Sequence, residues 1–236
     1  MSRQRLDPRT PLTELHVHLG AAVTPAIMWG IAHAQGIRLP TKDYWQFRQL
    51  ITVSARRGRS FDGYLQLFHW TELIQSSPLA VERSVYEVVG GAYRKNNVTT
   101  MELRFNPMKR NLGGERDLDH IIHAALRGMD IAVLEYGVKV CLLFCLAREF
   151  TYEQNEIILE KAIKYQSRGV LGIDLAGPES VNLELRLKDA QRKIQVHPDE
   201  RPVAIQLYGS AEDSMQRAAE MATEAGADFI ELRSKA

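Results

Sequence analysis

Two histidines one residue apart are the clearest chemical feature of the sequence. Residues 14–19 read Glu-Leu-His-Val-His-Leu. Side chains alternate along a strand, so His16 and His18 should share one face, with Cα atoms about 6.6 Å apart. Two imidazoles can converge on one ion from that separation. Zinc suits neutral imidazole, and catalytic zinc usually has about three protein ligands plus water. The pair therefore predicts a zinc site, with two hydrogen-bonded core histidines as the alternative.

Short β-rich runs alternate with longer segments of helical spacing. This order predicts an α/β fold of the TIM-barrel type, built from parallel strands joined by crossover helices. The expected strands are residues 13–19, 98–105, 138–146, 170–175, 203–208 and 228–232, and the expected crossover helices are residues 79–95, 118–133 and 153–168.

The number of expected strands is too small for a closed barrel. A closed (β/α)8 barrel needs eight strands, and about six are recognisable, which predicts an incomplete barrel or one completed by oligomerisation. The insert at residues 25–77 should be mostly helical, either as a lid over one barrel mouth or as ordinary core packing. Tyr64, Leu67, Phe68 and Trp70 are its expected packed layer.

Bulk composition favours a cytoplasmic protein. Thirty basic and twenty-nine acidic side chains give a formal net charge of +1, so we expect neither a nucleic-acid nor a membrane partner. No signal-like segment is recognised. Cys141 and Cys145 lie roughly 13 Å apart on one expected strand, beyond disulfide reach, and are interpreted as core thiols. A single domain over residues 1–236 is expected.

Four ordered stretches carry a resemblance to a known family. They are residues 14–20, residues 101–107, the strand that holds both cysteines, and residues 172–179. From about residue 12 to residue 179 the chain resembles the adenosine deaminase family of metal-dependent hydrolases. The resemblance implies a TIM barrel, His16 and His18 as the first two zinc ligands, and a purine nucleoside facing the backbone of Gly177. Gly20 stands where many members have an aspartate that contacts the ribose.

The reaction that this resemblance implies is hydrolytic deamination. Zinc lowers the pKa of its bound water, hydroxide attacks C6 of adenine, and a carboxylic acid protonates the ring. In the family, a His-Ala-Gly-Glu segment supplies that acid and the third ligand, and this segment is not recognised here. His197 and Glu200 reproduce its spacing, but only residues 198–202 separate them from the next expected strand, too few for a parallel crossover. A solvated loop is the favoured interpretation, and a substitute site is the alternative.

The C-terminal part resembles a different family. Residues 193–232 are similar to the tRNA-dihydrouridine synthases, in which Gln206 would match a flavin-contacting position. FMN is not expected, because the Gly-Cys-Pro segment and the phosphate-binding strands of that family are not recognised. The two resemblances predict a chimera of residues 12–188 with residues 189–236. We expect a deaminase-derived scaffold with little or no turnover. The alternative is an active purine nucleoside deaminase with a rebuilt zinc site.

Several other polar residues are weaker candidates. Asp174 is interpreted as a buried strand carboxylate, or alternatively as a partner of the metal histidines. His120 and His123 share one face of an expected helix and are interpreted as surface residues. The basic run at residues 56–59 is interpreted as a solvated loop.

Overall fold

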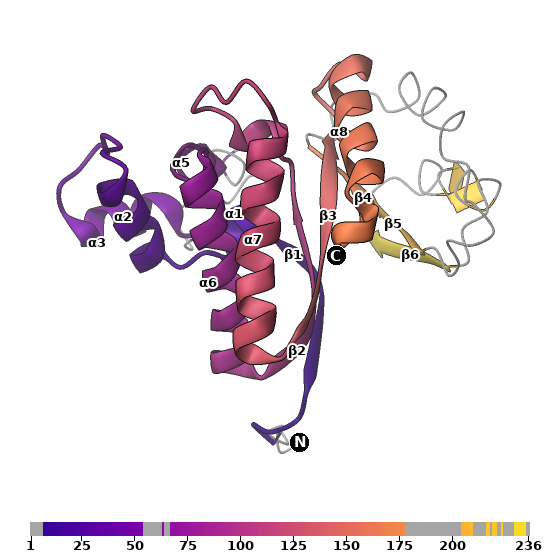
Figure 1. The fold of residues 1–236 in the computed structure, drawn as a ribbon, viewed down its shortest axis with the longest axis horizontal. Coiled ribbons are helices and arrows are strands. Elements are labelled where there is room, and N and C mark those ends of the chain that lie inside the picture. The colour runs from indigo at the N-terminus through magenta and orange to yellow at the C-terminus, as the bar shows by residue number, and fades with distance from the viewer. Residues whose placement is uncertain are drawn as a thin grey trace. The chain divides into compact units, whose positions relative to one another are not determined.

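The fold is described here from a computed structural model. It describes residues 7–53, 63, 67–177, 204–209, 216–217, 219–220, 223 and 229–234 (Figure 1). The chain forms two compact units. The first contains residues up to Cys145 together with Ile158–Ile173, and the second contains Leu146–Ile157 and the residues from Asp174 onward.

A sheet with the strand order β1-β2-β3-β4 forms the centre of the first unit. Its strands are β1 (Leu12–His18), β2 (Val98–Phe105), β3 (Lys139–Ala147) and β4 (Val170–Ala176), of which β3 and β4 continue into the second unit. Strand β2 pairs in parallel with both β1 and β3. Leu103, Phe105, Leu142 and Phe144 are buried, so both strands contribute apolar side chains to the core.

Two long helices pack beside this sheet. Helices α6 (Pro78–Asn96) and α7 (Asp119–Tyr136) lie side by side next to β1 and β2 (Figure 1). Helix α6 begins where the Ser77 hydroxyl accepts a hydrogen bond from the Ala80 amide, and α7 ends at Gly137 with φ of 65°. A capping hydroxyl and a left-handed glycine are typical helix boundaries. The apolar faces of α6 and α7 are buried, including Val81, Val85, Ile121, Ile122 and Leu126.

The segment between β1 and α6 is mostly helical in its described part, as predicted. It contains α1 (Leu19–Ala22), α2 (Pro25–Ala34), α3 (Tyr44–Ile51) and α5 (Phe68–Ile74). The Asp43 carboxylate caps α3 by accepting from the Gln46 amide at 2.8 Å. Helix α1 contacts α5 and α6, so this segment packs beside the carboxyl end of β1. Tyr64 lies outside the described residues.

The remaining elements complete the topology. The 3-10 turn η1 (Met108–Arg110) follows β2. Helix α8 (Tyr152–Lys164) follows β3, and the 3-10 turn η2 (Gln166–Arg168) follows α8. In the second unit, β5 (Ala204–Gly209) pairs in parallel with β6 (Phe229–Ser234).

The sequence located every described strand correctly. All six lie within one or two residues of their expected positions, and the α/β class is confirmed. The expected seam at residues 188 and 189 lies outside the described residues, so the division of the chain there stays a prediction. The expected helix 153–168 is divided into α8 and η2, and Gly169, with φ of 104°, ends the helical segment where predicted. Within the described part of the chain, no helix is long and apolar enough to cross a bilayer.

A glycine sets the close approach of α6 and α7. A Cβ built on Gly128 of α7 would collide with the Glu82 carbonyl of α6, whereas a Cβ on Gly91 of α6 meets nothing within 4 Å. We expect Gly128→Ala to lower the free energy of unfolding by about 1–3 kcal/mol, because the helices must move apart. Gly91→Ala should raise it by about 0.5–1 kcal/mol through helix propensity alone. Urea denaturation of both variants tests this, and equal effects would contradict it.

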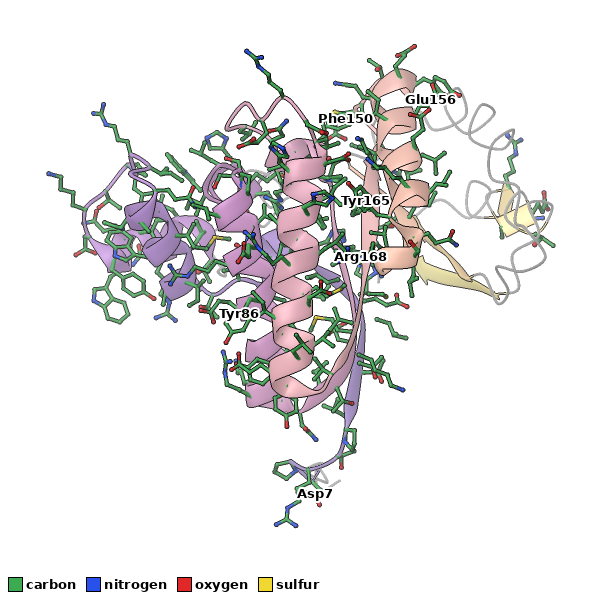
Figure 2. All side chains as sticks on the ribbon, viewed as in Figure 1. Asp7, Tyr86, Phe150, Glu156, Tyr165 and Arg168 are labelled. Carbon is green, nitrogen blue, oxygen red and sulfur yellow. The ribbon has the colours of Figure 1, made fainter. Side chains whose placement is uncertain are left out.

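Asp119 at the start of α7 is held by two lysines. Its carboxylate lies 2.6 Å from Lys161 Nζ and 2.5 Å from Lys164 Nζ. Tyr165 and Arg168, which follow these lysines, also extend toward α7 (Figure 2), where they contact His123 at 2.9 Å and Asp130 at 3.3 Å. Burial alone would raise the pKa of Asp119, but the two lysines outweigh it and hold the pKa below its ordinary value.

This pairing predicts acid-sensitive stability. A carboxyl group with a lowered folded pKa stabilises the fold above its unfolded pKa of about 3.9, and this contribution is lost as pH falls through the folded pKa. We expect Asp119→Asn to cost about 1–2 kcal/mol at pH 7, a difference that shrinks below about pH 4. Unfolding of both proteins by urea between pH 7 and pH 2 measures this difference. A constant difference would show that the charge is not responsible.

Candidate active site

A bulge in β1 sets the orientation of the first histidine. Glu14 pairs with Met101 and Val17 with Leu103, so three steps along β1 correspond to two along β2. Leu15 and His16 form the irregular step. The Arg104 side chain of β2 is only 2% exposed and its Nη2 donates to the Leu15 carbonyl at this step. Bulges re-aim side chains near functional sites, and here a buried arginine satisfies a carbonyl at the irregular step.

His16 and His18 lie close together, as predicted. Their ring centroids are 5.1 Å apart at an interplanar angle of 62°, and both side chains are half-buried. Two imidazoles bound to one tetrahedral zinc, with Zn–N distances of about 2.0–2.1 Å, place their ring centres about 5 Å apart. The arrangement of the two rings therefore fits a shared zinc ion.

Cys145 is the additional side chain that the structure brings to His18. Its Sγ lies 3.9 Å from His18 Nδ1, close enough for the two atoms to hold one metal ion. A zinc ion bound to one sulfur at about 2.3 Å and one nitrogen at about 2.0–2.1 Å separates these atoms by about 3.6 Å at the tetrahedral angle. The distance in the structure agrees with this value to within a few tenths of an ångström.

From the sequence, Cys145 is interpreted only as a core thiol. It is buried and outside any disulfide, as expected, but its position next to His18 was missed. The register explains the proximity: His18 pairs with Arg104, and Arg104 pairs with Leu143, two residues before Cys145. The carboxyl ends of parallel strands meet at one edge of a sheet, so this juxtaposition could have been inferred from a correct alignment of β1, β2 and β3.

The other cysteine has a different environment. Burial raises the pKa of the Cys141 thiol to about 11. Cys141 therefore stays a thiol at neutral pH, whereas metal ligands are thiolates. Because Cys141 lies on the same strand as Cys145, a substitution of Cys141 serves as the control for a substitution of Cys145.

Asn106 connects the ends of β2 and β3. Its amide nitrogen donates to the Cys145 carbonyl at 2.9 Å, and its side-chain oxygen accepts from the Lys109 amide at 2.9 Å. The second bond fixes the start of η1, which ends at Arg110. One buried amide thereby positions both the strand end that carries the thiol and the turn that carries an arginine, a role that no local sequence pattern indicated.

Arg110 is a buried cation next to the residue that follows the histidine pair. Its side chain is 4% exposed. A Cβ built on Gly20 of α1 would lie 2.7 Å from Arg110 Nη2 and 3.3 Å from Phe68 Cδ1. Burial lowers the pKa of Arg110, while Glu72 and Cys145 act in the opposite direction. The guanidinium remains charged at neutral pH, because arginine cannot be deprotonated in proteins.

Gly177 occupies a position that requires glycine. Its φ is 122°, and an added Cβ would meet Arg148 N at 3.1 Å and also the Glu149 carboxylate. The Arg148 amide donates to the Ala176 carbonyl at 2.8 Å, which holds the end of β4 against the turn after β3. The expected contact of the Gly177 backbone with a purine stays a prediction.

The weaker candidates divide into described and undescribed residues. His120 is exposed and pairs with Glu115 at 3.0 Å, and His123 hydrogen-bonds to Tyr165, so their interpretation as surface residues is confirmed. Asp174 is a half-buried residue of β4, and its role stays a prediction. Residues 56–59, His197 and Glu200 lie outside the described residues, as does the side chain of Gln206.

Comparison with known proteins gives a consistent family match. The family model described as adenosine deaminase matches residues 11–194. The adenosine deaminase of Clostridium kluyveri is 30% identical over 180 residues, which are 76% of this chain and 51% of that protein. The chain spans about half the length of the curated relatives it matches.

Solved structures with low sequence identity share the fold. An amidohydrolase from Burkholderia ambifaria with bound Zn has a TM-score of 0.75 at 18% identity, covering 94% of this chain and 58% of that chain. The N6-mAMP deaminase of Arabidopsis has a TM-score of 0.72 at 21% identity, covering 91% of this chain and 64% of that chain. These matches extend beyond residues 11–194 and place the chain among TIM-barrel-like folds.

The bond between Arg104 and the bulge predicts a large cost for its removal. Arg104→Met should lower the free energy of unfolding by about 1–3 kcal/mol, because it leaves the Leu15 carbonyl without this donor. The matched variant Arg168→Met removes an ion pair with Asp130 in which the arginine side chain is 60% exposed and the aspartate side chain 48% exposed. It should lower the free energy of unfolding by no more than about 1 kcal/mol. Urea unfolding of both variants measures the contrast. A cost for Arg104→Met no larger than that for Arg168→Met would contradict the assigned role.

Proposed function

Because the chain belongs to the adenosine deaminase family, we propose that it binds zinc through His16, His18 and Cys145 and takes a purine nucleoside as its ligand. The observation that carries the zinc proposal is the approach of Cys145 Sγ to within 3.9 Å of His18 Nδ1. The 5.1 Å separation of the two imidazole rings supports the same ion. The amidohydrolase neighbour from Burkholderia ambifaria, whose structure contains Zn, adds support at the level of the fold.

Each of the three side chains has a defined chemical role in this proposal. The imidazoles bind as neutral ligands and the Cys145 thiol binds as the thiolate, so metal binding releases a proton. Asn106 holds the Cys145 backbone through its carbonyl and fixes the direction in which the thiol projects. Zinc in such a site supplies a bound water of lowered pKa that can act as a nucleophile. From the family resemblance, we propose that the backbone of Gly177 contacts the purine.

We propose that deaminase turnover by this chain is slight. The sequence contains no His-Ala-Gly-Glu segment, which in the family provides the acid that protonates the purine ring. General acid catalysis contributes about 10²–10⁴-fold in rate. An active deaminase whose site has been rebuilt from other residues is the alternative, and Cys145 as third ligand is the feature that favours it.

The other expectations from the sequence stay proposals. They are a single domain, a cytoplasmic location, a homo-oligomer that completes the barrel, and a chimera whose C-terminal part derives from a dihydrouridine synthase. The family match reaches residue 194 and so includes the first residues of the synthase-like segment. None of the comparisons described above supports a second family.

Zinc content tests the ligand set. We expect one zinc ion per chain in protein stripped with a chelator and reloaded. His18→Ala and Cys145→Ser should each weaken zinc binding at least tenfold, whereas Cys141→Ser should leave it unchanged, because Cys141 lies about 13 Å away along β3. Elemental analysis and competition with a chromophoric chelator measure both quantities. In cobalt-loaded protein, a sulfur-to-metal charge-transfer band should disappear in Cys145→Ser and persist in Cys141→Ser.

Adenosine turnover in the same samples separates the two functional proposals. Little turnover with one bound zinc would support a metal-binding scaffold. Turnover that depends on both zinc and His18 would favour the rebuilt deaminase. A cobalt spectrum unchanged by Cys145→Ser would show that the thiol is not a ligand, and unaltered zinc content in His18→Ala would rule out the site.

A further inference from the structure

Arg110 carries unpaired donors in a buried position. Among the residues that the structure describes, neither Nε nor Nη1 has a hydrogen-bond partner, although the side chain is 4% exposed. Buried charged groups are normally paired, because leaving a buried donor without an acceptor costs about 1–3 kcal/mol and more when it is charged. The zinc proposal does not use this guanidinium.

Gly20 allows the guanidinium to lie against α1. The backbone does not require glycine there, because Gly20 is not among the residues with positive φ. A Cβ would lie 2.7 Å from Arg110 Nη2 and 3.3 Å from Phe68 Cδ1, so a larger residue at this position would have to displace the end of the arginine side chain. Gly20 is two residues after His18, so the cation is next to the proposed metal ligands.

The nearest acidic side chain does not pair with Arg110. Glu72 of α5 is half-buried and acts on Arg110 electrostatically, but no ion pair joins these two described residues. Glu72 lowers the local positive potential without occupying the donors. The guanidinium thus retains both its charge and its hydrogen-bonding capacity beside the histidine pair.

We propose that Arg110 binds an oxyanion, a phosphate or carboxylate group, carried by the ligand of this site. A planar guanidinium matches either group with two parallel hydrogen bonds, and burial strengthens such bonds. The identification of the ligand as a purine rests on the proposed function, whereas oxyanion binding itself requires only Arg110 and its surroundings. Gly20 then acts as a specificity residue, because an acidic side chain at that position would pair with Arg110 and compete with the ligand.

Calorimetric titration of the metal-free protein with inorganic phosphate tests this. We expect Arg110→Gln and Gly20→Asp each to weaken phosphate binding at least tenfold. Glu72→Gln should strengthen it, because a competing negative charge is removed. The control Arg127→Gln, an arginine whose side chain is 62% exposed and paired with Glu82, should leave binding unchanged. Thermal unfolding of each variant, followed by circular dichroism, confirms that it is folded.

A second titration identifies the group. Acetate replaces phosphate in an otherwise identical experiment. The anion that binds more tightly, and whose binding is weakened by Arg110→Gln, shows whether the natural ligand carries a phosphate or a carboxylate. Adenosine 5′-monophosphate should then bind more tightly than adenosine in the wild type and lose that advantage in Arg110→Gln. Failure of both anions to bind the wild type, or equal binding by folded Arg110→Gln, would overturn the proposal.

The two proposals fail in different ways. Anion binding is measured without metal or turnover, so loss of the zinc site leaves this test intact. Zinc content unaffected by Arg110→Gln, together with lost phosphate binding, would confirm that the two sites are separate neighbours. A Gly20→Asp variant that binds phosphate as tightly as the wild type would exclude competition at Arg110.

Discussion

The parallel register of β1, β2 and β3 is the constraint on which the candidate site depends. It brings His18, Arg104 and Leu143 into line across the sheet, so that the strand ends beyond them meet. The register between β1 and β2 shifts twice, at Leu12–Thr13 and again at Leu15 and His16, where the Arg104 side chain satisfies a carbonyl. Because the buried Arg104 side chain of β2 bonds to the backbone of β1, the position of His16 depends on this contact between the two strands as much as on the sequence of β1.

Two arginines near the end of β2 show contrasting solutions to the burial of charge. Arg104 donates through Nη2 to a carbonyl and lies near Glu102, so the fold compensates part of its desolvation. Arg110, six positions later, has two donors without acceptors in the described part of the chain. A protein tolerates such a cost at positions where function requires it, and this contrast separates an arginine that stabilises the fold from one that is available to a ligand.

Local pattern was sufficient to locate strands and helices but not to assemble the site. Alternation predicted that His16 and His18 share a face, and apolar spacing located α6 and α7, because both signals depend on residues close in sequence. The proximity of Cys145 to His18 depends on the pairing of three strands, and that of Arg110 to Gly20 on the path of η1. The bulge at Leu15 was equally invisible, because its compensating group lies 89 positions further along the chain. Non-local contacts of this kind leave no periodic trace.

The two hydrogen bonds of Asn106 have a thermodynamic consequence. This side chain binds the Cys145 carbonyl and the Lys109 amide of η1 at once, so the backbone segments that carry the thiol and the guanidinium are joined through one residue. A ligand that orders one of them reduces the conformational entropy that remains to be lost at the other. The affinities for a cation at Cys145 and for an anion at Arg110 are then linked, and linkage is reciprocal: each occupant should strengthen the other by the same factor.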